Sequence, residues 1–184
     1  MPIVALPVAE QRTRAWLDSF VVGLNLCPFA RPVIASEGLR LILTESNQVE
    51  DLLHGFLTEL QLISSSDEAE IATSLLVMPN ALTDFEDYLG FVGLAEELIE
   101  EADFEGVIQL ASFHPDYQFD TEPEDSASHF TNRSPYPMIH FLRGEMLERV
   151  LKDFPDPEQI PQSNIQTLEA MGRTEIERRW NSLK

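Results

Sequence analysis

The sequence predicts a single α/β domain over residues 1–184, with about four strands in a largely parallel or mixed sheet and helices packed on it. Three observations predict this class. A chain of 184 residues is in the size range of one domain. Short apolar runs alternate with segments of helical periodicity. Strands that are separated by helices favour right-handed crossovers, and these bring strands together in parallel.

A helix is predicted first, over residues 9–26. Apolar side chains recur there every four residues, at Trp16, Phe20 and Leu24. The segment CPFARPV, residues 27–33, then interrupts the pattern with two prolines.

A strand and the clearest helix of the chain come next. LRLILT, residues 39–44, is a short apolar run typical of a strand. Asn47 and Glu50 resemble a capping box, and apolar residues with helical spacing then continue to Ile63.

A second strand and helix repeat this arrangement. IATSLLVMP, residues 71–79, predicts a strand, and Thr83 with Glu86 forms another capping-box pattern. The helix that follows extends to about Ala102, and GVIQLASF, residues 106–113, predicts the third strand.

The last part of the chain holds the fourth strand, MIHFLR at residues 138–143, and a helix over about residues 145–154. A proline-rich connector leads to a further helix, residues 163–172, which Gly172 is suited to end.

The loop over residues 114–137 is long for a compact domain. Structureless loops of more than about 15 residues are usually functional or disordered. Aromatic and histidine side chains at its ends favour function, whereas residues 120–130 predict a mobile acidic segment.

The formal net charge of −20 is unevenly distributed. No Lys or Arg occurs between Arg40 and Arg133, although that interval holds 21 Asp and Glu residues. Such a field repels nucleic acid and anionic membranes, so we expect neither as a partner. A solvated surface is the simplest interpretation; a surface for divalent cations or for a basic protein are alternatives.

The compartment is predicted to be the cytoplasm. No apolar run approaches the roughly 18 residues of a membrane span, and the N-terminus lacks the features of a secretory signal. The single Cys27 cannot form an internal disulfide, which suits a reducing environment.

Polar residues follow the predicted strands at the edge where parallel sheets bind ligands. Asn80 follows the second strand, and His114 with Asp116 follows the third. His114, oriented by Asp116, is a candidate general acid–base; the alternative is a His that makes only local hydrogen bonds.

Arginines in aromatic, proline-containing segments are candidates for binding an anionic small molecule. Arg133 lies close to Tyr136, which two prolines hold rigid, and Arg31 and Arg143 lie in similar contexts. A guanidinium binds carboxylate or phosphate through two parallel hydrogen bonds. Salt bridges to the many acidic residues are the alternative.

Cys27 is a second candidate catalytic residue, as a nucleophile. At the end of the first helix its thiol is expected to be inert, whereas at the start of a new helix the thiolate is favoured. A buried, unreactive cysteine is the third interpretation.

A divalent metal is an alternative cofactor. His114, Asp116, His129 and His140 include the ligand types of zinc and non-haem iron sites, although their spacing matches no compact motif. His140 lies in mid-strand, which also suits a hydrogen-bonded core histidine.

Four motifs together resemble a known family: NLCPFA, SFHPDYQF, TNRSPYPMIHFLR and DPEQIPQSNIQTLEAMG, in this order. They are similar to the bacterial family catalogued as domain of unknown function 1415, and the resemblance covers nearly the whole chain. It implies no reaction or substrate.

The resulting hypothesis is a small-molecule enzyme that acts on an anionic substrate by His/Asp acid–base chemistry, with Cys27, His114 and Arg133 around one concavity. A metal-binding protein and a non-catalytic acidic interaction module are the alternatives.

Overall fold

The computed structural model of the chain describes residues 3–152 and 154–183. Its sheet has the strand order β1-β2-β4-β3. The strands are β1 (Leu39–Leu43), β2 (Thr73–Val77), β3 (Ile108–Phe113) and β4 (Met138–Arg143).

The sequence predicts a sheet that is either largely parallel or mixed, and the structure confirms a mixed sheet. β1 pairs with β2 in parallel, whereas β4 is antiparallel to both of its neighbours. The segment 114–137 contains no helix that crosses the sheet, so the chain re-enters at the end where β3 leaves it. β4 therefore runs opposite to the other three strands.

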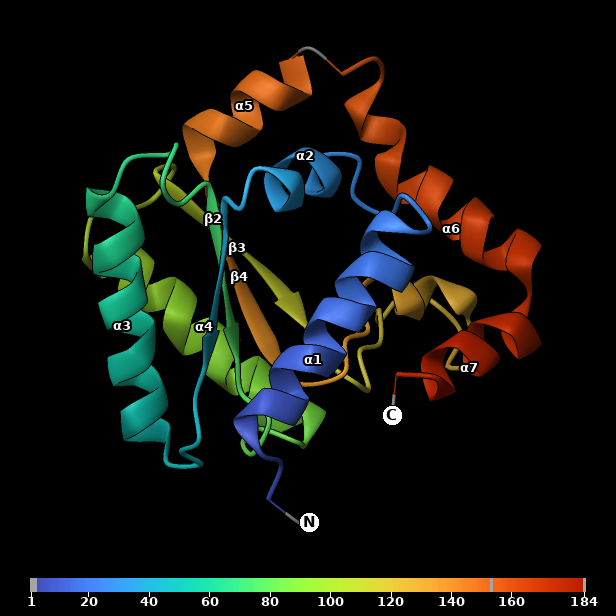
Figure 1. Cartoon of the computed structure of the whole chain (residues 1–184), viewed down its shortest axis with the longest axis horizontal. Coiled ribbons are helices and arrows are strands. Elements are labelled where there is room, and N and C mark those ends of the chain that lie inside the picture. The colour runs from blue at the N-terminus through green and yellow to red at the C-terminus, as the bar shows by residue number, and fades with distance from the viewer. Residues whose placement is uncertain (1–2, 153, 184) are drawn as a thin grey trace.

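Two long helices cover one face of the sheet, α3 (Val49–Ser65) and α4 (Phe85–Glu101) (Figure 1). Their apolar stripes bury one core against the strands. Its members from the helices and the sheet include Leu52, Phe56, Leu60, Phe91, Ala95, Ile139 and Phe141.

The opposite face is covered by segments from both ends of the chain and by part of the loop between β3 and β4 (Figure 1). These are α1 (Leu6–Trp16), the π-helical η1 (Leu17–Val22), α2 (Ala30–Ala35), η2 (Ala127–Thr131), α5 (Gly144–Lys152), η3 (Pro157–Gln159), α6 (Ile160–Met171) and α7 (Arg173–Asn181). The second core lies between them and the strands, and it includes Trp16, Phe20, Leu75, Val77, Met138 and Leu168.

Both predicted capping boxes are wrong. Helix α3 has Gln48 as its N-cap and no side-chain cap; Ser46, just before it, accepts from the backbone N–H of Gln48. In α4 the carboxylate of Asp84 accepts from the N–H groups of Glu86 and Asp87. Asp84 lies one residue closer to the helix than Thr83, so it reaches the free amides first.

The segment 120–130 is only partly a surface loop. Its second half enters η2, where Ser128, His129 and Phe130 are buried. The predicted mobility of this segment stays a prediction.

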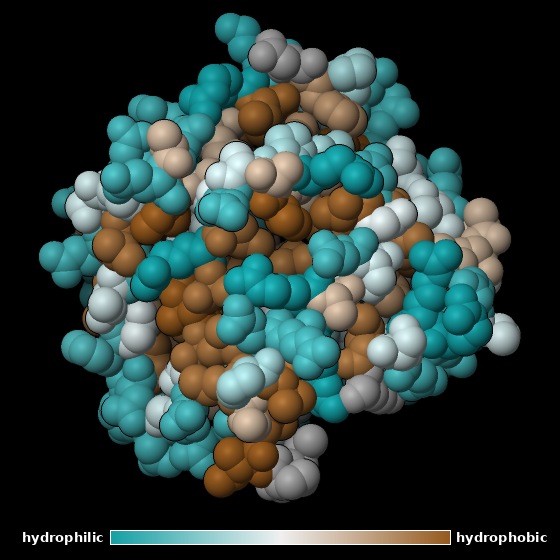
Figure 2. Space-filling view, viewed as in Figure 1, coloured by the Kyte–Doolittle hydropathy of each residue, from teal (hydrophilic) through white to brown (hydrophobic). Residues whose placement is uncertain are grey.

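No helix within residues 3–152 and 154–183 is long and apolar enough to cross a membrane. Figure 2 shows apolar side chains gathered on the surface between α3 and α1, where the edge strand β1 lies. Most side chains of β1 are partly exposed there.

Gly144 joins β4 to α5 at a very close backbone contact. Its N–H donates to the carbonyl of Val107 at 2.9 Å, and a Cβ at this position would come 1.9 Å from the carbonyl oxygen of Gly106. Only a glycine therefore allows the start of α5 to lie against the start of β3.

The substitution Gly144→Ala should lower the free energy of unfolding by about 2 kcal/mol or more, because backbone must move. Urea denaturation measures the change. The matched control is Gly90→Ala in α4, where a Cβ meets no atom within 4 Å. This control should stabilise by about 0.5–1 kcal/mol. Equal effects of the two substitutions would contradict the close contact.

Candidate functional site

A cavity of about 580 Å³ lies between the sheet and the helices of the second face. Its floor is formed by side chains of β2, β3 and β4, including Leu75, Ala111 and His140. Trp16 and Met146 are among the helical side chains that close it. Most of the wall is apolar.

The cavity lies over the face of the sheet and extends toward both of its ends. Phe113 and Asn132 line it near the end of β3. Arg143 and Leu142 line it at the opposite end, next to Thr73.

The carboxyl ends of β1, β2 and β3 meet at the end of the sheet where Phe113 lies, and side chains pack on that end. The hydroxyl of Tyr88 donates to the carbonyl of Met138 at 2.6 Å and accepts from the N–H of Phe113 at 2.9 Å. Tyr88 and Phe85 also pack on the ring of His114. Tyr88 thereby links the end of β3 to the start of β4.

His114 is fully buried and both of its ring nitrogens are bonded. Nδ1 accepts from the N–H of Asp116 at 3.0 Å, so Nε2 carries the proton and donates to the carbonyl of Leu82 at 3.0 Å. Burial lowers the pKa of His114, which keeps the ring neutral. This geometry is that of a structural histidine that closes a turn, and it leaves no nitrogen for a substrate.

His129 has the same arrangement within the long loop. Its Nδ1 accepts from the N–H of Phe119 at 3.2 Å, and its Nε2 donates to the carbonyl of Pro123 at 2.8 Å. Arg133 donates to the carbonyl of Tyr117 at 3.2 Å and lies 4.7 Å from the ring centroid of Phe130. These contacts hold the loop together.

Three further predicted binding residues also have structural contacts or lie outside the cavity. The amide side chain of Asn80 pairs with the backbone of Val4 through two hydrogen bonds. Tyr136 is buried and accepts from Arg12, and Arg31 is exposed on α2.

The sequence predicts that Cys27, His114 and Arg133 surround one concavity. Cys27 lines this cavity, whereas His114 and Arg133 do not. Of the residues proposed from the sequence, the cavity is lined by Cys27, His140 and Arg143, within the part of the chain that the structure describes. The ring nitrogens of His114 and Nε of Arg133 bond to the backbone instead.

The proposed metal ligands do not come together either. Within residues 3–152 and 154–183, no three His, Cys, Asp or Glu side chains are grouped so that they could hold a metal ion. His114 and His129 use both ring nitrogens in hydrogen bonds, which leaves no lone pair for a metal.

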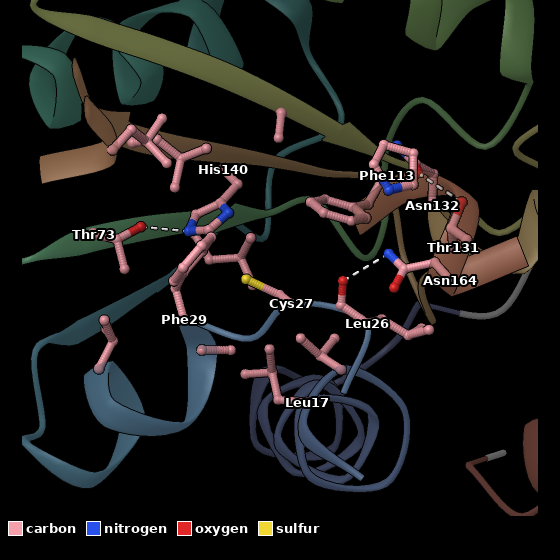
Figure 3. Close-up of a pocket in the computed structure, with 18 of the residues that line it drawn as sticks. Leu17, Leu26, Cys27, Phe29, Thr73, Phe113, Thr131, Asn132, His140 and Asn164 are labelled. Carbon is pink, nitrogen blue, oxygen red and sulfur yellow. Dashed lines mark hydrogen bonds between the residues drawn. The ribbon is translucent and has the colours of Figure 1, made fainter. Parts of the chain in front are cut away.

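His140 is the weakest of the three histidine candidates from the sequence. In the structure, however, one of its ring nitrogens remains available to a ligand. Its side chain lies on the cavity face of the sheet, between Leu75 of β2 and Ala111 of β3. Nε2 is hydrogen-bonded to the hydroxyl of Thr73, and the other ring nitrogen faces the cavity (Figure 3). The hydrogen bonds of the described residues include none to Nδ1. Burial lowers the pKa of His140 to about 4.

Cys27 also points into this cavity, beside Phe29 (Figure 3). Burial raises the pKa of its thiol, although the N–H groups of Phe29 and Ala30 act in the opposite direction. The thiol is therefore protonated at neutral pH, and it needs a base before it can act as a nucleophile.

Arg143 lines the cavity, but its guanidinium is bound to the backbone. Nε donates to the carbonyl of Ile71 at 3.0 Å and Nη2 to the carbonyl of Ser66 at 2.9 Å. These bonds hold the connection between α3 and β2, so Arg143 is poorly placed to bind an anion in the cavity.

Sequence reasoning missed the other polar residues of the cavity wall, which are Thr73, Thr121, Glu122, Ser128, Thr131, Asn132 and Asn164. Asn164 donates to the carbonyl of Leu26 at 2.7 Å, which ties α6 to the segment of Cys27 (Figure 3). Period-two alternation in MIHFLR could have placed His140 opposite Phe141. The pairing with Thr73 could not be found without the strand order.

Residues 8–178 match the family described as "Protein of unknown function (DUF1415)". The chain belongs to this family. The match covers nearly the whole chain and confirms the resemblance that the four sequence motifs indicate. No curated protein and no solved structure matches the chain.

In this DUF1415 protein, the substitution His114→Ala should lower the free energy of unfolding by about 2 kcal/mol or more. It leaves the carbonyl of Leu82 and the N–H of Asp116 without their partner and removes a fully buried ring that packs on Phe85 and Tyr88. Thermal and urea melts measure the loss. The control is His54→Ala, at an exposed position of α3, which should change little. An unchanged melt for His114→Ala would contradict the structural role.

The stability of the DUF1415 protein should also fall with pH below about 6.5. The lowered pKa values of His114 and of His140, the latter to about 4, mean that the unfolded chain binds protons that the folded chain does not. The stabilisation is complete above the unfolded value of about 6.5 and is lost as the pH falls toward the folded values.

Urea unfolding at about pH 7.5 and about pH 5 tests this, with a loss of roughly 2 kcal/mol from His140 and a further loss in the same direction from His114. The variant His140→Phe should lose less stability than the wild type over this interval. A wild type that is equally or more stable at the lower pH would contradict the assignment.

Proposed function

We propose that this DUF1415 protein binds and acts on a small, predominantly apolar molecule in the cavity. The observation that carries the proposal is a mostly apolar cavity of about 580 Å³ that Nδ1 of His140 faces without a hydrogen-bond partner among the described residues. Ligand sites of proteins commonly have about 300–1,000 Å³, an apolar lining and a few polar groups that fix orientation.

His140 supplies the proton acceptor of the proposed chemistry. Because burial keeps the ring neutral at physiological pH, Nδ1 retains its lone pair. Cys27 supplies a thiol from the facing wall. The structure records no hydrogen bond between Sγ and Nδ1, so a bound ligand or a change of side-chain rotamer is needed to connect them. Apo geometry of this kind is common in enzymes.

The structure gives less support to the hypothesis, drawn from the sequence, of an enzyme that acts on an anionic substrate. This hypothesis needs a free imidazole at His114 and a free guanidinium at Arg133, and both groups are hydrogen-bonded to backbone carbonyls. We therefore assign the proton-transfer role to His140 and the ligand to the cavity.

The two tryptophans of the chain provide a direct binding test. Trp16 lines the cavity, whereas Trp180 packs on Phe20 and Phe130. In the Trp180→Phe variant, titration with n-octanol should change the fluorescence of Trp16 saturably, because the alcohol enters beside the indole. The same probe should slow alkylation of Cys27, the single cysteine, by iodoacetamide.

The matched control is Ala111→Leu in the same background. Ala111 lines the cavity beside His140, so the larger side chain fills space and should weaken n-octanol binding severalfold. Inorganic phosphate should leave the fluorescence unchanged. A saturable response to phosphate with no response to n-octanol would contradict an apolar site.

A further inference from the structure

We propose that the cavity selects ligands whose polar end is an uncharged hydrogen-bond donor, such as an alcohol or phenol hydroxyl. A chain of hydrogen bonds from the backbone of β4 fixes His140 as an acceptor toward the cavity. This inference rests on the proposed function, and it adds the chemical class of the ligand.

The first link of the chain joins Thr73 to the carbonyl of Phe141. The two oxygens lie 2.7 Å apart, and Thr73 is almost fully buried. A carbonyl oxygen carries no proton, so the proton between these atoms must be that of the Thr73 hydroxyl. The hydroxyl has only one proton and has no other to donate.

The second link joins Thr73 to His140. Because the Thr73 hydroxyl donates to Phe141, it can only accept from the imidazole. Nε2 of His140 therefore carries the ring proton. In a neutral imidazole the remaining nitrogen, Nδ1, is then an acceptor. This is the nitrogen that faces the cavity in Figure 3.

The surroundings of His140 keep the ring neutral and exclude a charged partner. Arg143 and Glu122 are the charged side chains among the described residues that line the cavity. The guanidinium of Arg143 is held by two backbone carbonyls, and Glu122 accepts from Ser126. A carboxylate ligand would bring a desolvated charge and no proton to share with Nδ1. An alcohol brings the missing donor.

The position of His140 in the sheet leaves space for the head group of a ligand. Its neighbour on β3 at the same level is Ala111, whose methyl group is small, and its neighbour on β2 is Leu75. An apolar body would then extend along the wall formed by the helices.

Three probes with the same apolar body test the preference: n-octanol, n-octyl methyl ether and octanoate. The Trp16 fluorescence of the Trp180→Phe variant reports binding. The ether lacks only the donor proton, so n-octanol should bind about three- to tenfold tighter, the range of one net hydrogen bond. Octanoate should bind at least about tenfold more weakly than n-octanol, because its charge must be desolvated.

Variants of the two side chains assign the preference to the hydrogen-bond chain. In His140→Phe the alcohol and the ether should bind equally. Thr73→Val removes the group that orients His140 and should reduce the preference, whereas Thr73→Ser retains a hydroxyl and should restore it. Thr73 is thus a positioning residue. Its direct readout is the ¹⁵N spectrum of the imidazole, which should show the neutral Nε2–H tautomer in the wild type and in Thr73→Ser.

The outcomes separate this inference from the proposed function. Equal binding of alcohol and ether to the wild type, or a protonated Nδ1 at neutral pH, overturns the donor preference and leaves an apolar site intact. No binding of any of the three probes overturns both. If the preference for n-octanol persists in His140→Phe, another group causes it, and the role of His140 is overturned.

Discussion

The position of strand β4, antiparallel between β2 and β3, is the constraint on which the site depends. It places the apolar residues of β4 alternately in the two cores, with Phe141 facing α3 and α4 and His140 facing the cavity. It also brings the carbonyl of Phe141 within hydrogen-bond distance of Thr73 on β2. The close contact of Gly144 with the start of β3 fixes the end of the strand. The imidazole of His140 is therefore held in a wall that is mostly apolar.

Three histidines show why residue type alone could not locate the site. His114, His129 and His140 are all partly or fully buried, and all are oriented by a hydrogen bond through Nε2. In His114 and His129 a backbone N–H also occupies Nδ1, and the ring links two segments of chain. These N–H groups come from the loop conformation, which the sequence does not reveal. At His140 no hydrogen bond of the described residues occupies Nδ1, and this difference is why we assign the proposed role to His140.

Much of the fold could be predicted, because it depends on local patterns. The strands at residues 39–43 and 138–143 and the helix α3 follow from apolar periodicity, and Gly172 ends α6 as its type indicates. The pairing of the strands could not be predicted, since it depends on where the loop over residues 114–137 returns. The short helix α2 begins at Ala30 with Phe29 as its N-cap, and not at Cys27 as one interpretation of the sequence considered. The site depends on strand order, so it was less predictable than its scaffold.

The most direct test of the cavity as the functional site is to identify the metabolites that the protein retains from a cell extract. The wild type and the Ala111→Leu variant, both shown to be folded by circular dichroism, are incubated with the same extract, and bound compounds are identified by mass spectrometry. The account predicts that uncharged, largely apolar compounds with a hydroxyl or N–H group are enriched on the wild type and lost from the variant. Enrichment of anionic compounds to the same extent on both proteins would contradict it.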